Sequence, residues 1–341
     1  MSLRAAFEQQ AKSCEGLGSP FTAMLLRLVG ERLTDGHPVG AFLFDWPFDT
    51  FRSGAVALRL AGALHSLVLL DKDEGLAAVY PPATPEPDRL WREVDRAMRR
   101  HADHIIGWMA SAPQTNEIRR SCALIPAFHL LAQATGLPLV MSEIGASAGL
   151  NLNWDAYALE IGGRVWGPEG AKVRLTPEWR GAEPPRADVQ VLAREGCDIN
   201  PLDPCSADDR LRMLSYIWPD QFERIANTRQ ALAMACAAEH VVAREDALAF
   251  LARRLAPVEG AVRVIYHSIM WQYLSDADQA RGTAMIAAAG DTATAHAPLA
   301  WVRAEADGLE SAAITLTLWP GGEERELGRM DFHGRWVKWN G

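Results

Sequence analysis

The sequence predicts an α/β protein with a doubly wound, mostly parallel sheet, preceded by an all-helical cap. From residue 138 onward, short apolar runs alternate with segments of helical periodicity, which is typical of βαβ units. Before that point, apolar residues recur at helical spacing and no segment shows the alternation of a strand. We therefore expect a helical cap domain at 1–136 and an α/β domain at 137–341.

Helical periodicity in the first part predicts helices at 4–13, 20–33, 55–70, 86–111 and 115–135. In the fourth of these, Leu90, Val94, Met98, Ile105 and Met109 form one apolar stripe. Proline and glycine stand at the joints between the segments, as expected for helix boundaries.

The second part begins with a buried strand at 137–142, a glycine-rich turn and a helical pattern that reaches residue 157. A hairpin about Gly162-Gly163 opens a surface insertion at about 158–187. Further strands are expected at 189–197, 240–244, 262–267 and 299–305, with helices at 206–216, 220–237, 246–255 and 276–289. Antiparallel strands at 312–319, 324–330 and 334–339 would close one edge of the sheet.

Composition excludes several classes of protein. Of 341 residues, 49% are hydrophobic and 23% charged, as in folded globular proteins. With 34 basic and 43 acidic residues the net charge is −9, which disfavours nucleic acid as a partner. No apolar run is long enough to span a membrane, and the N-terminus lacks the pattern of a signal peptide. We expect a cytoplasmic protein with a small-molecule substrate; nothing in the sequence indicates an oligomeric state.

Cysteine and histidine patterns give no metal site. The five cysteines are scattered without a C-x-x-C pair, which argues against a secreted disulfide framework and a structural zinc site. His101 and His104 share a helix face, yet no third ligand is near in the sequence.

The most informative stretch joins the first strand to the next helix. It contains Glu143, Gly145, Ser147, Gly149 and Asn151. Small residues let a ligand approach the backbone, and the first N–H groups of a helix suit a hydroxyl or an anion. Glu143 would accept hydrogen bonds from an ammonium group or from hydroxyls.

The same turn also spells G-x-S-x-G, the nucleophile elbow of serine hydrolases. In that interpretation Ser147 is the nucleophile and requires an acid and a histidine further along the chain. Asp331 and His333 are too close together for this, and the strands that usually precede the elbow are replaced by helices.

Polar residues follow the other parallel strands too. They are Asp198 and Asn200 after the second strand, Asp246 and Ala247 after the third, and His267, Ser268, Trp271 and Gln272 after the fourth. Because the carboxyl ends of parallel strands share one edge of a sheet, these residues should face a common crevice. There Asp198 is placed to receive both hydroxyls of a ribose.

This succession resembles the class I methyltransferases that use S-adenosylmethionine, over about 138–340. Glu143, Gly145 and Gly149 match the acid-x-Gly-x-Gly-x-Gly turn of that family, with Ser147 in place of the middle glycine. The resemblance implies that Asp198, with Asn200, holds the ribose and that Asp246-Ala247 lies beside the adenine.

The spacing allows a second alignment. Asp198 lies 49 residues beyond Gly149, whereas about 20 is usual, and we attribute the excess to the insertion. If the second strand were 158–161 instead, Glu160 would replace Asp198. The chain also looks like an uncharacterised bacterial family with GASAGLNL, GCDxNPLDP, WQYL and LTLWPGG stretches, a likeness that supplies no substrate.

The resemblance implies methyl transfer from S-adenosylmethionine to a small molecule. His267 is the candidate base, because an unperturbed imidazole titrates near neutrality. Trp271 and Gln272 would line the acceptor pocket, and Arg119 or Arg120 would meet a carboxylate or an anionic substrate. A serine hydrolase that uses Ser147 and a catalytically silent nucleoside-binding protein of the same fold are the alternatives.

Overall fold

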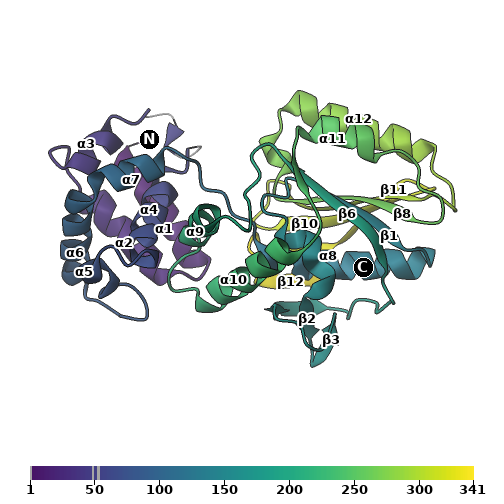
Figure 1. Ribbon diagram of the computed structural model, residues 1–341, viewed down its shortest axis with the longest axis horizontal. Helices are drawn as coiled ribbons and strands as arrows, with labels where there is room; N and C mark the ends of the chain where they lie inside the picture. Colours follow the sequence, from purple (N-terminus) through teal and green to yellow (C-terminus); the bar gives the residue numbers. More distant parts are fainter. Residues whose placement is uncertain (1, 48–49, 52–53) are drawn as a thin grey trace. The chain divides into compact units, whose positions relative to one another are not determined.

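The computed structural model describes residues 2–47, 50–51 and 54–341. The chain folds into two compact units (Figure 1). The helical unit combines Met1–Thr115 with Ser206–Arg229, and the sheet unit combines Asn116–Cys205 with Gln230–Gly341. The division therefore falls at Asn116 rather than at 136/137, and the helical unit also takes a segment from the middle of the α/β region.

The helical unit is built from short amphipathic helices around one apolar core. They are α1 (Leu3–Gly16), α2 (Pro20–Arg32), α3 (Pro38–Phe44), α4 (Val56–Leu69), α5 (Glu74–Ala77), α6 (Pro87–Arg100), α7 (Ala102–Met109), α9 (Ala207–Ser215) and the first half of α10 (Phe222–Ala237). The periodic stretch 86–111 is two helices, because the backbone leaves helical geometry at His101. The sequence did not predict α3 and α5.

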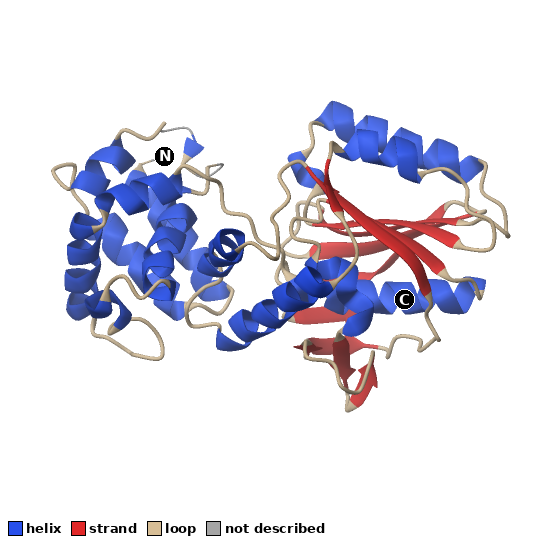
Figure 2. Ribbon diagram, viewed as in Figure 1, coloured by secondary structure: helices blue, strands red, loops and turns tan. Residues whose placement is uncertain are grey.

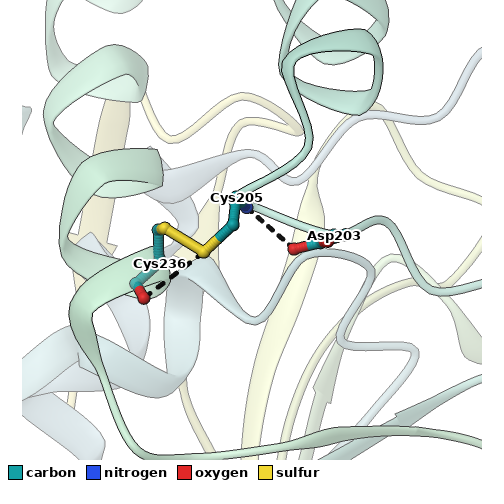
Figure 3. Close-up of a disulfide and its surroundings, with 3 residues drawn as sticks. All are labelled: Asp203, Cys205 and Cys236. Atoms are coloured by element: carbon teal, nitrogen blue, oxygen red, sulfur yellow. Dashed lines mark hydrogen bonds between the residues drawn. A yellow bond between two sulfur atoms is a disulfide. The ribbon is translucent and has the colours of Figure 1, made fainter.

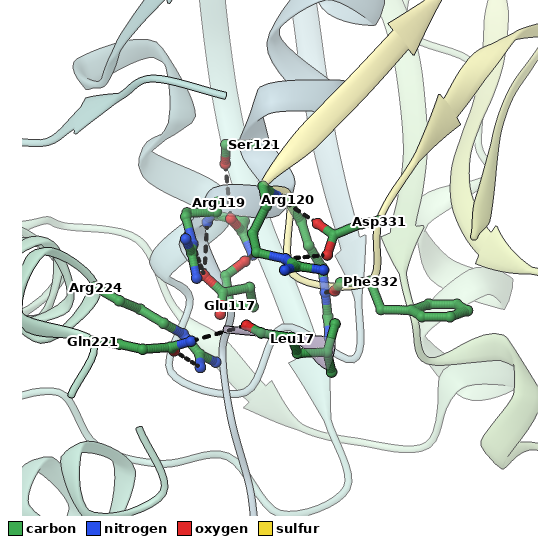
Figure 4. A network of polar contacts seen from close by, with 11 residues as sticks. Leu17, Glu117, Arg119, Arg120, Ser121, Gln221, Arg224, Asp331 and Phe332 are labelled. Atoms are coloured by element: carbon green, nitrogen blue, oxygen red, sulfur yellow. Dashed lines mark hydrogen bonds and ion pairs between the residues drawn. The ribbon is translucent and has the colours of Figure 1, made fainter. Parts of the chain in front are cut away.

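Residues 206–229 belong to the helical unit through both apolar and polar contacts. Trp218 is buried in its core. The Asp220 carboxylate accepts hydrogen bonds from Ser19 Oγ at 2.5 Å and from the backbone N–H of Phe21 at 3.0 Å, at the start of α2. Gln221 Nε2 donates to the carbonyl of Leu17 at 3.2 Å (Figure 4). A carboxylate at a helix start is stabilised by the unpaired N–H groups there.

The sheet unit contains a nine-stranded, mostly parallel sheet (Figure 2). Its strands are β1 (Leu139–Ile144), β5 (Glu178–Gly181), β6 (Val191–Asp198), β7 (Val242–Arg244), β8 (Val262–Ser268), β9 (Leu299–Ala306), β10 (Ala312–Trp319), β11 (Glu323–Met330) and β12 (Trp336–Trp339). The order across the sheet is β5-β12-β11-β10-β9-β8-β1-β6-β7. The structure is thus a mixed α/β fold, as predicted.

The strand order reverses at β1. The chain runs outward from β1 to β6 and β7, and then returns to place β8 and β9 on the other side, all parallel. A reversal of this kind is a topological switch point, where the loops after the strands diverge and leave room for a ligand. Strands β9 to β12 then form an antiparallel meander, as expected from the sequence.

Helices cover both faces of the sheet. On one face α11 (Ala247–Arg254) and α12 (Asp276–Asp291) pack against Ile265 and Trp301. On the other, Phe128 of α8 (Ser121–Thr135) packs edge-on against Tyr266, with ring centroids 5.2 Å apart. Neighbouring strand residues point to opposite faces, so a strand covered on both sides is buried throughout, as β8 is. Because α8 packs on the sheet, the unit begins before the first strand.

The insertion after β1 takes the place of a crossover helix. The glycine turn leads into a 3-10 helix, η3 (Leu150–Ala156), rather than an α-helix. A small sheet follows, in the order β3-β2-β4, made by β2 (Ala158–Ile161), β3 (Arg164–Trp166) and β4 (Arg174–Leu175). The hairpin about Gly162-Gly163 is confirmed. The alternative alignment is wrong, because Glu160 lies in this small sheet while β6 pairs with β1.

Two further features bear on the predictions. Within the described ranges, no helix combines the length and the apolar character that crossing a bilayer requires. Cys205 and Cys236 form a disulfide (Figure 3). The sequence did not indicate this pair, because residues 31 apart are brought together only by the tertiary structure.

Candidate functional site

The turn after β1 has the backbone of a tight binding loop. Gly145, Ser147 and Gly149 have φ angles of 70°, 54° and 71°. A side chain at Gly145 would also meet Met270 at 2.9 Å, and one at Gly149 would meet Val242 at 2.9 Å. Both glycines are therefore required by conformation and by space. Ser147 adopts the left-handed region without being glycine, a strained geometry that is common at functional sites.

Asp198 lies at the end of β6, directly against this turn. Its Oδ2 accepts the backbone N–H of Ser147 at 2.9 Å, and its Oδ1 accepts that of Asn200 at 2.8 Å. Arg244 in turn donates to the Asn200 side chain at 2.9 Å. The carboxylate is partly exposed, and each of its oxygens has a second lone pair. It is thus fixed in place while still able to accept hydroxyl groups.

The Ser147 side chain is buried, with 3% of its surface exposed. Its hydroxyl makes no hydrogen bond to any part of the described chain. A buried hydroxyl without a partner costs about 1–3 kcal/mol, which a bound ligand oxygen or nitrogen would recover. In particular, no histidine is bonded to it among the described residues, so the hydrogen bond of a nucleophile to its base is not formed.

Glu143 is a buried acid at the end of β1, 2% exposed. Burial raises its pKa to about 8, the charge of Asp198 adds to the rise, and the Tyr266 hydroxyl and the Arg120 charge oppose it. The Tyr266 hydroxyl donates to Glu143 Oε2 at 3.4 Å. The carboxyl group is therefore mostly protonated at neutral pH, and a nearby ligand cation would favour its ionised form.

His267 lies at the end of β8, fully buried, and both of its ring nitrogens are engaged. Trp301 Nε1 donates to His267 Nε2 at 3.0 Å, and His267 Nδ1 lies 2.6 Å from Glu305 Oε1. Since an indole N–H only donates, Nε2 is the acceptor and Nδ1 carries the proton. Trp271 stacks on the imidazole, with centroids 4.7 Å apart. This geometry favours a positioning role for His267, and its role as a base stays a prediction.

Glu305, at the end of β9, organises the turn after β8. Besides His267, it accepts the backbone N–H groups of Met270 at 3.1 Å and of Trp271 at 3.3 Å. The Trp271 side chain consequently packs inward, whereas Gln272 is exposed. The sequence reasoning missed Glu305. The rule that selected the other strand ends would have found it, because it closes the predicted strand 299–305.

The segment before α8 approaches the same end of the sheet (Figure 4). Arg120 donates to the carbonyls of Ser268 at 3.1 Å and Phe332 at 3.2 Å. The partly buried Arg119 lies beside Glu117, with Nε 3.6 Å from a carboxylate oxygen. Arg120 thus ties the end of β8 to the loop after β11, a structural role that the sequence did not reveal.

Two groups that were expected to contact a ligand form hydrogen bonds within the protein instead. Asn151 accepts from Ser121 Oγ at 2.8 Å and donates to the carbonyl of Glu117 at 3.4 Å. The N–H of Leu150, the first residue of η3, donates to Asn116 Oδ1 at 2.8 Å, although the first N–H groups of this helix were expected to face a ligand. Asn151 therefore supports the turn from behind rather than facing the crevice.

The residues that follow β7 include Asp246, which is more exposed than Asp198 at the end of β6. Asp246 caps α11 by accepting the N–H groups of Leu248 at 2.9 Å and Ala249 at 3.3 Å. Ala247 follows it as the first, buried residue of the helix. The register Asp198↔Arg244 places Asp246 two residues beyond the level of Asp198, at the same edge of the sheet.

The described ranges contain no group of three or more His, Cys, Asp or Glu side chains arranged to hold a metal ion. His101 and His104 turn to different partners: His101 Nε2 lies 3.2 Å from Asp73, and His104 Nε2 lies 2.9 Å from Ser66 Oγ. Both histidines therefore have local roles in the helical unit.

Comparison with known proteins places the chain in a family but gives no activity. Neither the curated proteins nor the solved structures contain a match to the chain. The family model described as "Uncharacterized protein conserved in bacteria (DUF2332)" matches residues 4–339, nearly the whole length. The likeness noted from the GASAGLNL and LTLWPGG stretches therefore extends over both units, and the chain belongs to this bacterial family.

Proposed function

We propose that the protein binds S-adenosylmethionine and transfers its methyl group to a small molecule. One observation carries the proposal: Asp198 is held by the backbone of the Gly145–Gly149 turn, at the switch point of the parallel strands. The strand order β7-β6-β1-β8-β9 is the 3-2-1-4-5 order of nucleotide-binding α/β folds. In such folds an acid at the end of the second strand receives the ribose hydroxyls.

The side chains present fit this ligand. Asp198 offers lone pairs to a ribose, and the unpartnered Ser147 hydroxyl lies in the turn beside it. Glu143 supplies a carboxylate for an ammonium group, and Asp246 lies at the neighbouring strand end for an adenine amine. When bound, the cofactor supplies a methyl group activated by its sulfonium charge.

The residues of the chain would act mainly by orientation and by excluding water. Glu305 and His267 hold the turn after β8 rigid, and this turn presents Gln272 outward. Arg120 fixes the same strand end from the other side. His267 stays the predicted base, although both of its ring nitrogens have partners within the protein.

The proposal is tested by titrating the purified protein with S-adenosylhomocysteine in a calorimeter, after checking that no ligand co-purifies. We expect a dissociation constant in the micromolar range. Absence of binding at millimolar ligand would contradict it. A protein that binds the nucleoside but methylates no acceptor in a broad small-molecule panel would be the catalytically silent alternative.

A serine hydrolase remains the second candidate, because Ser147 has the positive φ of a nucleophile elbow within G-x-S-x-G. Ser147→Ala separates the two. We expect it to weaken S-adenosylhomocysteine binding by no more than about tenfold, the effect of one neutral hydrogen bond. Labelling of the wild type by a fluorophosphonate probe, lost in Ser147→Ala, would instead support the hydrolase.

A further inference from the structure

We propose that the Cys205–Cys236 disulfide is a redox-controlled clamp on the loop that carries Asp198 and Asn200. Reduction of the clamp weakens binding in the crevice. The effect on binding rests on the proposed adenosyl site, whereas the effect on the loop does not.

The bond joins the two segments that flank the second and third strand ends. Cys205 lies at the end of the loop that leaves β6, and Cys236 lies in the last turn of α10, shortly before β7 (Figure 3). Their Cα atoms are 4.9 Å apart across 31 residues. Both residues are exposed, so a thiol in solution can reach the disulfide.

The loop from Asp198 to Cys205 is held at two points. In its middle, the N–H of Leu202 donates to the carbonyl of Ser147 at 3.3 Å, and the Leu202 side chain is buried. At its far end, Asp203 accepts the N–H of Cys205 at 2.8 Å. The chain enters the helical unit directly afterwards, at Ser206. The disulfide is thus the covalent tie of this end of the loop to the sheet unit.

The chemistry is thiol–disulfide exchange. A thiolate of a low-molecular-weight thiol attacks one sulfur, the Cys205–Cys236 bond breaks, and a second thiol resolves the mixed disulfide. The protein gains two electrons and two protons, and two thiols become one disulfide. Cys14, Cys122 and Cys197 are buried, and burial raises their pKa values, so they do not compete.

The experiment compares oxidised full-length protein with protein kept in dithiothreitol, with Cys205→Ser/Cys236→Ser as the matched variant. Hydrogen exchange of residues 199–205 is measured in each without ligand, and S-adenosylhomocysteine is then titrated. We expect reduction to speed hydrogen exchange in the loop and to weaken S-adenosylhomocysteine binding by about tenfold. Binding to the reduced protein would have to order one or two residues that reduction has freed, and this ordering costs free energy. The variant should have the same hydrogen-exchange rates and the same affinity as the reduced protein. Dithiothreitol should change neither quantity in the variant.

The outcomes separate the two proposals. Oxidised protein that binds no ligand, while reduction still speeds exchange, would overturn the adenosyl site and leave the loop clamp standing. Exchange that is unchanged by reduction would overturn the clamp, whatever the affinity. If the variant does not fold, the two redox states of the wild type decide alone. A variant that still responds to dithiothreitol would assign the effect to the other three cysteines and reject the clamp.

Discussion

Replacing Asp198 by alanine should weaken S-adenosylhomocysteine binding by about a hundredfold. A hydrogen bond to a charged group contributes about 1.5–3 kcal/mol, and the carboxylate would accept one from each ribose hydroxyl. The substitution also removes the acceptor of the Ser147 and Asn200 N–H groups, so the turn loses its support. Calorimetric titration of both proteins measures the change.

Asp188→Ala is the matched control, since Asp188 is an exposed carboxylate before β6, at the opposite end of that strand from Asp198. It should bind ligand within about twofold of the wild type, as expected for a surface substitution. Thermal unfolding of Asp198→Ala checks that the fold is retained. Equal affinity of Asp198→Ala and wild type would show that the ribose is not held here.

Glu143→Gln should stabilise the free protein at neutral pH by about 2–3 kcal/mol. The folded pKa of about 8 lies above the usual value of 4.5 for a glutamate side chain. An acid raised in this way contributes most to stability below its unfolded pKa, and the contribution is lost as pH rises toward the folded pKa. A neutral glutamine avoids that loss, so the gain should grow between pH 4.5 and 8, as measured by urea unfolding.

Ligand binding should become tighter as the pH rises, over the range in which Glu143 loses its contribution to the stability of the free protein. The ammonium group of S-adenosylhomocysteine would favour the ionised Glu143, so the wild type should release a proton on binding and bind more tightly as pH rises from about 6 to 8. Calorimetry in buffers of different ionisation enthalpy measures that proton. In Glu143→Gln the release and the pH dependence should disappear, and affinity should fall.

Glu195→Gln provides a control of opposite sign. The hydrogen bond from Arg253 lowers the pKa of Glu195. This carboxylate therefore stabilises the fold at neutral pH, and its contribution is lost as the solution is acidified through its folded pKa. The stability of each variant relative to the wild type is followed against pH. If it changed in the same direction for Glu143→Gln and Glu195→Gln, the pKa of Glu143 would not be raised in the folded protein.

The strands and most helices could be predicted because local pattern decides them. The apolar run at 137–141 has no polar face, and the Gly18-Ser19-Pro20 joint marks the start of α2. The excursion of 206–229 could not be predicted, since an apolar stripe shows that a helix is packed but not which core it enters. Strand β5 was missed because its polar residues form an edge.

The site was predictable where a rule of topology applies. Asp198 meets Ser147 because both follow neighbouring parallel strands. The strand-end rule would have found Glu305, the partner of His267. The partner of Arg120 was not predictable, because the Phe332 carbonyl lies in a loop 212 residues further along the chain, and only the folded sheet brings it close. The pairing of Cys205 with Cys236 was not predictable either, because only the folded chain brings the two residues together.

The discontinuous helical unit also has a consequence for synthesis on the ribosome. Its first 115 residues emerge without Trp218 and α9, which complete its core and follow only after β1 and β6 have been made. At about 5–20 residues per second, the nascent helices wait roughly ten seconds for their last partners. The amino-terminal part of the chain therefore emerges first, yet its core is completed only after the first two central strands have been synthesised.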